Sequence, residues 1–339
     1  MDEERFKRFL TEGERVPKNL PESVVNSNLA AARKFDEQLR SGGPDRSMED
    51  ASGKDFRAYL EALAEKEEAS EELLLALLRY ARFTGNKNVE LAIVGLLDGV
   101  DVLSRLSETV RERLGEAKHE AVFQGVELPK LGSSSDDWHT ITRRFMEQLE
   151  HCAGERVCRE ILLTGPHAGP PEWYEEERQA YLKSKNLDEF LTTRHEMAVA
   201  TLKQHMEENT LFFNQEIDQS VIDFVSSNQE IMGGVREGGV IYETKIPYMA
   251  IEYLRERDDT MRRYYYCHCP WAREGVRTGV KISPNFCYCS AGYHKKPWEV
   301  IFGEPVRAEV VSSVLNGDDI CRFAIHIPRA GEEQKEGLD

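Results

Sequence analysis

Apolar residues between positions 55 and 130 recur at spacings of three and four, the pattern of amphipathic helices. The clearest helix follows Ser70, a favoured N-cap residue type, and is expected to end at Gly85, since glycine readily adopts the left-handed conformation found after helices. Two more helices are predicted in "NVELAIVGLLDGV" and "LSETVRERLGEAKHE". Short connections between them predict a helical domain of the bundle type. This domain could serve for packing or dimerisation, or it could bind a partner. Dimerisation would make the protein a homodimer.

The segments on either side of this helical domain have a different composition. Residues 1–54 are polar and charged and end in "RSGGPDRSMEDASG", which predicts a partly disordered segment and a linker. Within it, Phe6, Phe9 and Leu10 could dock a short helix. Residues 131–228 are predicted to form a helical connecting region, interrupted by the Gly- and Pro-rich loop "TGPHAGPPEW".

Strand periodicity replaces helical periodicity beyond residue 228. The segment from Val240 to Ile246 puts Tyr242 and Thr244 on one face and Glu243 and Lys245 on the other. Residues 306–327 predict a hairpin, with "NGDD" as its turn and alternating apolar positions on both sides. The expected fold class is therefore α+β: an N-terminal helical bundle followed by an antiparallel-sheet α+β ligand-binding domain at 229–328, with a solvated tail at 329–339.

Composition and charge narrow the partners that this fold can have. The 339 residues are 40% hydrophobic, and 61 acidic residues against 44 basic ones give a net charge of −17. This charge repels phosphate backbones and anionic lipid, so nucleic acid and membranes are not expected partners. The sequence contains neither a signal-peptide pattern nor an uncharged apolar run of roughly eighteen residues, which favours a cytoplasmic location.

Four of the seven cysteines form the pattern Cys-x-Cys, seventeen residues, Cys-x-Cys, at Cys267, Cys269, Cys287 and Cys289. In a reducing cytoplasm, and with an odd total, close cysteine pairs indicate metal ligands or redox groups more than disulfides. Four thiolates would select zinc, or alternatively an iron-sulfur cluster, over magnesium or calcium. The remaining interpretation is a set of thiols that binds no metal.

Geometry permits these thiols to converge, although one intervening residue is fewer than the usual two to four. Side chains two apart on an extended strand share a face, with their backbones about seven Å apart. A bend at Pro270 and a helix start near Ser290 would bring each pair closer together. Cys321, in an alternating strand, is expected to be an ordinary core thiol.

Neighbouring polar and aromatic residues suggest chemistry beside the metal. If a coordination position is open, His294, His268 and Glu299 are the candidates for proton transfer. His268 lies between two ligand candidates and would point away from them, which favours a structural role for this histidine. The pocket for a small-molecule ligand would be lined by aromatic side chains, which could instead simply form core: Tyr242, Tyr266, Trp271, Tyr293 and Trp298.

The run "PWEVIFGEPVRAEVVSSVLNGDDICRFAIHIP" resembles the closing part of 4-vinyl reductase-type domains and of the L-2-amino-thiazoline-4-carboxylic acid hydrolase family. Its matching residues are Gly317, Asp318, Cys321, Phe323 and Ile325. The whole cysteine-rich stretch also looks like a group of uncharacterised prokaryotic proteins. The resemblance implies an α+β fold shared with a trafficking-complex subunit and a ligand pocket. It also implies small-molecule sensing, cysteine-bound metal or, in the hydrolase branch, opening of a ring containing a carbon-nitrogen bond.

Three hypotheses about function follow. The first is a metal-binding protein, with zinc as the expected metal, that has an aromatic pocket beside its four cysteines. The second is a metal-assisted hydrolase of a small substrate with a carbon-nitrogen bond. The third is a redox or ligand sensor that signals through its helical domain.

Overall fold

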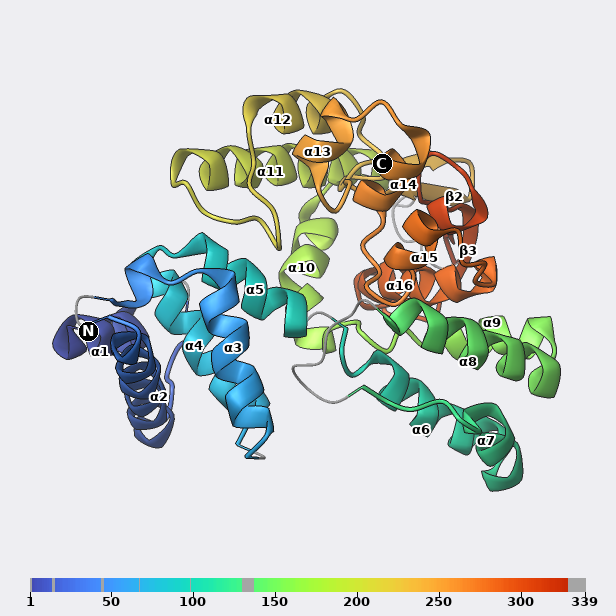
Figure 1. The fold of residues 1–339 in the computed structure, drawn as a ribbon. Coiled ribbons are helices and arrows are strands. Elements are labelled where there is room, and N and C mark those ends of the chain that lie inside the picture. Colours follow the sequence, from blue (N-terminus) through green and yellow to red (C-terminus); the bar gives the residue numbers. More distant parts are fainter. Residues whose placement is uncertain are drawn as a thin grey trace. The chain divides into compact units, whose positions relative to one another are not determined.

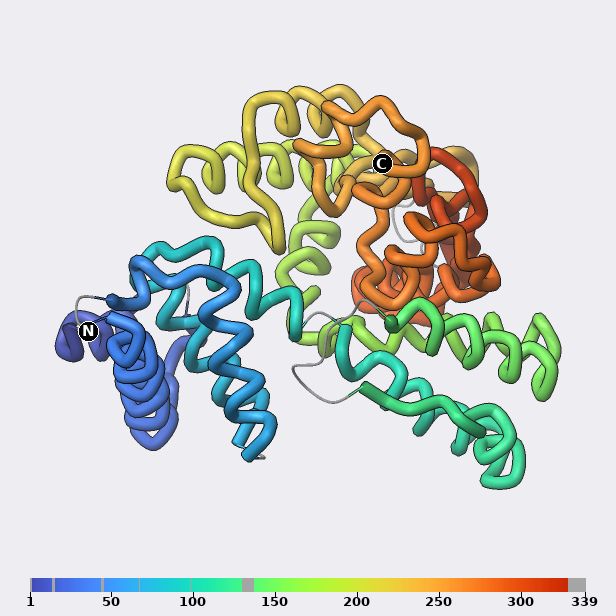
Figure 2. The backbone as a smooth tube through the Cα atoms, in the orientation of Figure 1, coloured from blue at the N-terminus to red at the C-terminus, as the bar shows by residue number. Residues whose placement is uncertain are grey.

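The chain divides into two compact units, each described here by itself. The computed structural model describes residues 2–13, 16–43, 46–66, 68–97, 99–129 and 137–328. The first unit comprises the described residues of Met1–Val100 and Pro129–Ser134, and the second those of Asp101–Leu128 and Ser135–Asp339. Figure 1 labels their elements, and Figure 2 traces the backbone. The predicted tail at 329–339 lies outside the described residues.

The described elements of the first unit are all helical. They are α1 (Glu3–Glu12), α2 (Glu22–Ser41), the 3-10 turn η1 (Met48–Asp50), α3 (Gly53–Ala64), α4 (Glu71–Thr84) and α5 (Lys87–Leu97). Helix α4 confirms the prediction from sequence: the Ser70 side chain accepts a hydrogen bond from the Leu73 N–H at 3.2 Å, and Gly85 ends the helix at a φ of 74°. Helix α3 begins at a capping box formed by Ser52 and Asp55.

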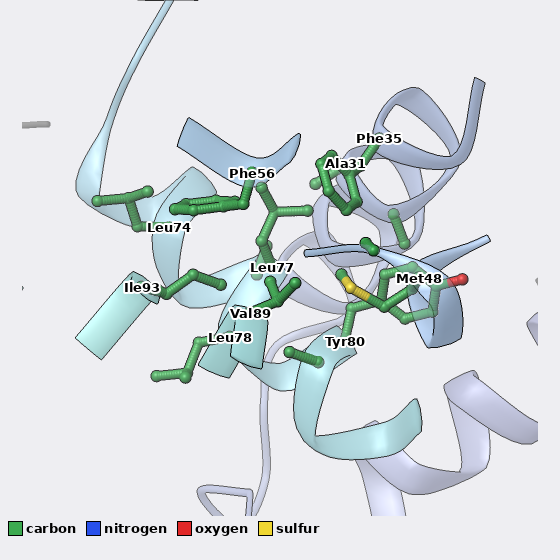
Figure 3. Close-up of a cluster of buried hydrophobic side chains, with 14 of the residues drawn as sticks. Ala31, Phe35, Met48, Phe56, Leu74, Leu77, Leu78, Tyr80, Val89 and Ile93 are labelled. Atoms are coloured by element: carbon green, nitrogen blue, oxygen red, sulfur yellow. The ribbon is translucent and has the colours of Figure 1, made fainter. Parts of the chain in front are cut away.

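One hydrophobic core holds the first unit together (Figure 3). It includes Phe6 and Leu10 of α1 and Phe35 of α2, all almost completely buried, beside Phe56 of α3 and Tyr80 of α4. Residues 1–54 were expected to be a polar segment and linker, yet they supply two core helices. Apart from the buried Asp36, their charged residues are exposed or half-buried, so the polar composition conceals an apolar stripe on each helix.

The second unit combines helices with a small sheet. Its helices are α6 (Val102–Leu114), α7 (Glu116–Phe123), α8 (Trp138–Ala153), α9 (Glu155–Leu162), α10 (Glu175–Lys183), α11 (Leu187–Glu207), α12 (Gln219–Ser226), α13 (Ala250–Arg255), α14 (Asp259–Tyr266), α15 (Arg273–Thr278) and α16 (Tyr288–Phe302), with 3-10 turns η3 (Pro171–Tyr174), η4 (Pro284–Cys287) and η5 (Val314–Asn316). Among the described residues, no helix combines the length and apolar composition needed to span a membrane.

The strands are β1 (Val235–Glu237), β2 (Val240–Thr244), β3 (Arg307–Ser312) and β4 (Arg322–His326), in the antiparallel order β1-β2-β4-β3. The predicted hairpin is confirmed, with Ala308 opposite Ile325 and Val310 opposite Phe323. Its connection is longer than the predicted turn, since it contains η5. These elements confirm the α+β fold class.

The sheet is covered by helices that precede it in the chain as well as by α16. Leu187, Phe190 and Leu191 of α11 share a hydrophobic core with Ile241 of β2 and Ile325 of β4. The predicted boundary after residue 228 therefore does not separate two compact units. The segment 101–128, predicted as part of the helical domain at 55–130, also belongs to the second unit.

Strand β2 turns one charged position toward this core. Ile241 and Glu243 are buried, whereas Val240 and Tyr242 on the opposite face are only half-buried. The alternation of the strand was predicted from the sequence. That the buried face would carry a carboxylate was not evident from it.

Candidate functional site

Each of the four paired cysteines lies where a helix begins or ends. Cys267 follows the last residue of α14, and Cys269 comes just before α15, with its carbonyl accepting the Ala272 and Arg273 N–H groups at 3.1 and 2.9 Å. Cys287 ends η4, and Cys289 lies in the first turn of α16. The chain therefore does turn after Cys269, as the sequence around Pro270 suggests, and helix α16 starts two residues before Ser290.

The two pairs meet inside the second unit. Burial raises the pKa of the Cys269 thiol well above its ordinary value. Negative charge on a neighbouring thiolate would raise this pKa further, with the largest effect from Cys267, then Cys289, then Cys287. Cys321 lies close to these cysteines: it shares a core with Cys267 and contributes to the raised pKa of Cys287. We call these five residues the thiol cluster: Cys267, Cys269, Cys287, Cys289 and Cys321. Cys269 and Cys287 are partly exposed and the other three are buried.

The surroundings of the thiol cluster favour neutral thiols over bare thiolates. Burial raises the pKa of Cys289 to about 12 and that of Cys321 to about 11, although the Lys245 ammonium lowers both. Lys245 lies at the end of β2, where its Nζ donates a hydrogen bond to Ser290 Oγ at 3.0 Å. All seven cysteines are free.

No ligand set for a metal ion is preassembled in the part of the chain that the structure describes. There, no group of three or more His, Cys, Asp or Glu side chains is arranged so that it could hold an ion. The thiols are neighbours, and metal binding would need their side chains to reorient. The donor types, five thiols with a nearby imidazole, are those that zinc takes in closed sites.

The three predicted proton-transfer residues have different environments. His294 Nδ1 pairs with Glu243 Oε2 at 2.7 Å, and burial lowers the pKa of His294. His268 Nε2 hydrogen-bonds the Ile246 carbonyl oxygen at 2.6 Å, which fits a structural histidine. Glu299 pairs with two lysines of its own helix, Lys295 at 3.1 Å and Lys296 at 3.9 Å. His294 is thus the one of the three that has a buried carboxylate partner.

Glu243 is the centre of a buried polar network that sequence reasoning missed. Its Oε1 accepts hydrogen bonds from Arg194 Nη1 at 2.6 Å and Trp298 Nε1 at 3.1 Å. Burial alone would raise the pKa of Glu243, but the Arg194 charge and the hydrogen bonds outweigh it, so the pKa lies well below its ordinary value. Glu243 therefore stays ionised and holds the His294 ring by its Nδ1 atom.

The five predicted pocket aromatics have structural contacts in this fold. Tyr266, Trp271 and Trp298 are fully buried; the Tyr266 hydroxyl donates to the Lys245 carbonyl oxygen, and Trp271 stacks on Trp138. The other two also have partners: Tyr242 packs under the Arg322 guanidinium and Tyr293 stacks on His167. A surface depression does occur on α11 and α12, lined by His195, Glu196, Val199, Ala200, Lys203 and Ser226, none of them a predicted pocket residue.

His167 is a second residue that sequence reasoning missed. It belongs to the loop "TGPHAGPPEW", and its Nδ1 lies 3.3 Å from Cys289 Sγ. Burial lowers the pKa of His167 to about 3, so its imidazole is neutral and keeps a lone pair. The loop was noted in the sequence only for its glycines and prolines, and no local pattern relates it to a cysteine 122 positions later.

Comparison with known proteins adds one match. Residues 249–331 are similar to a family of unknown function, DUF6144. This stretch contains the whole thiol cluster, whereas Glu243, Lys245, Arg194 and His167 precede it. No curated protein and no solved structure matches the chain. The resemblance to 4-vinyl reductase-type domains and the related hydrolases stays a prediction.

Proposed function

We propose that the second unit binds a soft metal ion through the thiolates of Cys267, Cys269, Cys287 and Cys289. Zinc is the expected ion. The observation that carries this proposal is that the segments holding the two Cys-x-Cys pairs pack together: α14 and η4 both contact η5, and Cys269 packs against the core that contains Cys267 and Cys321. Buried thiols resist deprotonation, and a divalent cation supplies the charge that stabilises several thiolates together. A reducing compartment such as the cytoplasm would keep these thiols available.

An iron-sulfur cluster is the alternative cofactor for the same donor set. Zinc has no redox chemistry and would hold the ends of α14, η4 and the start of α16 together. An iron-sulfur cluster would instead give the protein visible absorbance and a reduction potential.

Metal content tests the proposal. The protein is purified without oxygen, and its zinc and iron are measured together with its absorbance spectrum. We expect about one equivalent of zinc, as for one closed site. Cys269→Ser removes the central thiol and should abolish binding, whereas Cys152→Ser, on α8 and outside the thiol cluster, should not. Less than roughly a tenth of an equivalent of any metal in the wild-type chain would refute the proposal.

The His294–Glu243 pair supports a second candidate function, hydrolysis of a small substrate with a carbon-nitrogen bond. A carboxylate that accepts the Nδ1 proton of a histidine orients the ring and leaves Nε2 as a base for activating water. The side chain of His294 is 16% exposed, so solvent reaches it.

L-2-amino-thiazoline-4-carboxylic acid, named by the sequence resemblance, is a direct probe of this second function. Ring opening would be measured as the loss of the thiazoline absorbance. His294→Gln should abolish turnover, whereas Glu299→Gln should leave it unchanged because Glu299 pairs only with lysines in the contacts described above. If the wild-type chain leaves this substrate intact, it is not a hydrolase of that ring.

A further inference from the structure

Arg273, the first residue of α15, is a half-buried cation without a carboxylate partner. In the part of the chain that the structure describes, its side chain forms no ion pair, and its buried Nε atom has no hydrogen-bond partner. The acidic residue beside it, Glu274, pairs instead with Arg277 at 2.6 Å. By contrast, Arg194 and Arg322, which are also half-buried, each lie 2.6 Å from a glutamate. The charge of Arg273 is therefore not neutralised by an acidic side chain of the described residues.

Two tyrosine rings lie against the Arg273 guanidinium. Its Cζ atom is 4.6 Å from the ring centroid of Tyr248 and 5.5 Å from that of Tyr264. Such cation–π contacts attract the charge and hold the planar group in place. They offset only part of the lost hydration, because an aromatic ring has no full negative charge. The guanidinium still has the fork of N–H donors that matches the two oxygens of a carboxylate.

The Tyr248 hydroxyl lies beside the same guanidinium and is a second donor. Its oxygen accepts a hydrogen bond from Asn214 Nδ2 at 2.9 Å, and no acceptor for its own hydrogen is found among the described residues. Guanidinium and hydroxyl are thus neighbouring donors that no acidic group satisfies. An ionised carboxylate, which only accepts hydrogen bonds, has the chemistry to satisfy both.

The turn that positions Asn214 has a strained backbone. Phe212 and Gln215 exchange backbone hydrogen bonds at 2.9 and 3.1 Å, and Phe213 between them has a φ of 50°. The Phe213 side chain is 65% exposed, so burial of its ring does not offset the strain. The Gln215 side chain bonds to the backbone on both sides of Tyr248 and fixes the turn there. Strain of this kind is concentrated at ligand-binding and active sites, and here it keeps the Asn214 amide on the Tyr248 hydroxyl.

We propose that Arg273 and the Tyr248 hydroxyl bind the carboxylate group of a small organic acid. A single guanidinium matches the single charge of a carboxylate better than the double charge of a phosphate. Because Arg277 neutralises Glu274, this neighbouring residue does not repel the anion. The proposal goes beyond both proposed functions, since it requires neither a metal ion nor His294.

Calorimetric titration of the full-length chain with acetate and benzoate tests this proposal. We expect saturable binding of both anions at a single site, weaker binding of inorganic phosphate, and no binding of benzamide, which resembles benzoate but has no charge. Arg273→Lys keeps the charge but loses the planar fork of donors, so it should weaken benzoate binding by about tenfold or more. Arg257→Gln removes an exposed cation between α13 and α14 and should leave the affinity unchanged.

A second pair of variants keeps the test decisive if a substitution at Arg273 impairs folding. Tyr248→Phe keeps the ring against the guanidinium and removes only the hydroxyl, so it should weaken benzoate binding severalfold. Tyr242→Phe is its matched control, because the Tyr242 ring also lies against a guanidinium, that of Arg322 at 4.0 Å, which already pairs with Glu230. Tyr242→Phe should leave the affinity unchanged. Circular dichroism and tryptophan fluorescence verify that each variant is folded.

Each contrary outcome has a definite meaning. If the wild-type chain binds neither acetate nor benzoate, Arg273 is only a structural contact of two tyrosines, and the proposal is refuted. If Arg273→Lys and Tyr248→Phe both keep full affinity, the anion binds elsewhere and the assignment to these residues is wrong. If phosphate binds more tightly than benzoate, the carboxylate assignment is wrong. None of these results changes the metal content, so the proposed metal function succeeds or fails separately.

Discussion

Replacing Glu243 with glutamine should destabilise the second unit strongly, because Arg194 would lose its buried counter-charge. The Glu243 side chain is 6% exposed and the Arg194 side chain 16%, and their atoms lie 2.6 Å apart. Glutamine has almost the same shape as glutamate, so packing around β2 and α16 is kept. Arg194 would then keep a hydrogen bond to the neutral Gly233 carbonyl oxygen at 3.2 Å and an ion pair with Glu177, whose side chain is 38% exposed and 3.3 Å from Nε.

The magnitude follows from this burial. Removing one partner of a buried ion pair typically costs about 3–5 kcal/mol, since the remaining charge is uncompensated. For a unit of this size, each kcal/mol corresponds to about 2–4 °C in melting temperature, so we expect a decrease of about 6–20 °C. The matched change Glu177→Gln removes a more exposed partner and should cost no more than about 1 kcal/mol.

Tryptophan fluorescence can measure this loss in the second unit alone. All four tryptophans, Trp138, Trp173, Trp271 and Trp298, lie in that unit. Urea titrations followed at the tryptophan emission therefore report its free energy of unfolding without a contribution from the first unit. Far-ultraviolet circular dichroism, which reports both units, should show a second transition that Glu243→Gln leaves unchanged.

Equal losses for Glu243→Gln and Glu177→Gln would refute this reasoning, because Arg194 would then not depend on Glu243. A double-mutant cycle with Arg194→Met gives an independent check. If the two residues stabilise each other, their effects should be non-additive by about 0.5–3 kcal/mol. Additive effects would mean that the short contact contributes nothing beyond packing.

Three other predictions concern pH and the first unit. The folded-state pKa of Glu243 lies below its ordinary value, so the stability that its carboxylate contributes should be lost as the pH falls below about 5. The folded-state pKa of His294 is also lowered, so the stability that its neutral ring contributes should be lost as the pH falls below about 6.5. In urea titrations at different pH, Glu243→Gln should flatten the lower part of this profile. Tyr80→Phe removes a hydroxyl that donates to the buried Asp36 carboxylate at 2.9 Å and should cost about 1–3 kcal/mol by circular dichroism. Ser52→Ala removes the N-cap of α3 and should cost about 1 kcal/mol in the same assay, and no change would contradict the capping box.

Elements defined by local patterns could be predicted from the sequence. The helix between Ser70 and Gly85 is specified by its own caps and apolar spacing, and the hairpin pair β3 and β4 by its alternation. The short helix predicted to dock through Phe6, Phe9 and Leu10 is confirmed by α1, but the prediction of a polar segment and linker for residues 1–54 is wrong, because composition was weighed over the whole segment. Phe6 and Phe35 are few among many charges, but each is fully buried, and a few such residues on one face suffice to dock a helix.

The candidate site was predictable only where its residues are close in sequence. The Cys-x-Cys pairs are visible because their members are two apart, and their meeting at Cys269 depends on the turns that follow Cys269 and precede α16. The sequence placed Glu243 on the same face of β2 as Lys245 but did not indicate that it is buried, since alternation identifies two faces and does not say which of them packs on the core. That choice is made by Arg194, which lies 49 positions earlier and neutralises the carboxylate inside the core.

The stretch similar to DUF6144 therefore holds the thiols but not the groups that act on them. Within residues 249–331 are the whole thiol cluster and His294. The carboxylate that pairs with His294, the ammonium that lowers the pKa of Cys289 and Cys321, and the imidazole beside Cys289 come from Glu243, Lys245 and His167, which all precede it. Helix α16 contacts both sets of residues. His294 and Trp298 on one of its faces pair with Glu243, and Gly292 on another face packs against the loop that carries His167. The chemistry of the site is thus a property of the assembled second unit and not of its cysteine motif.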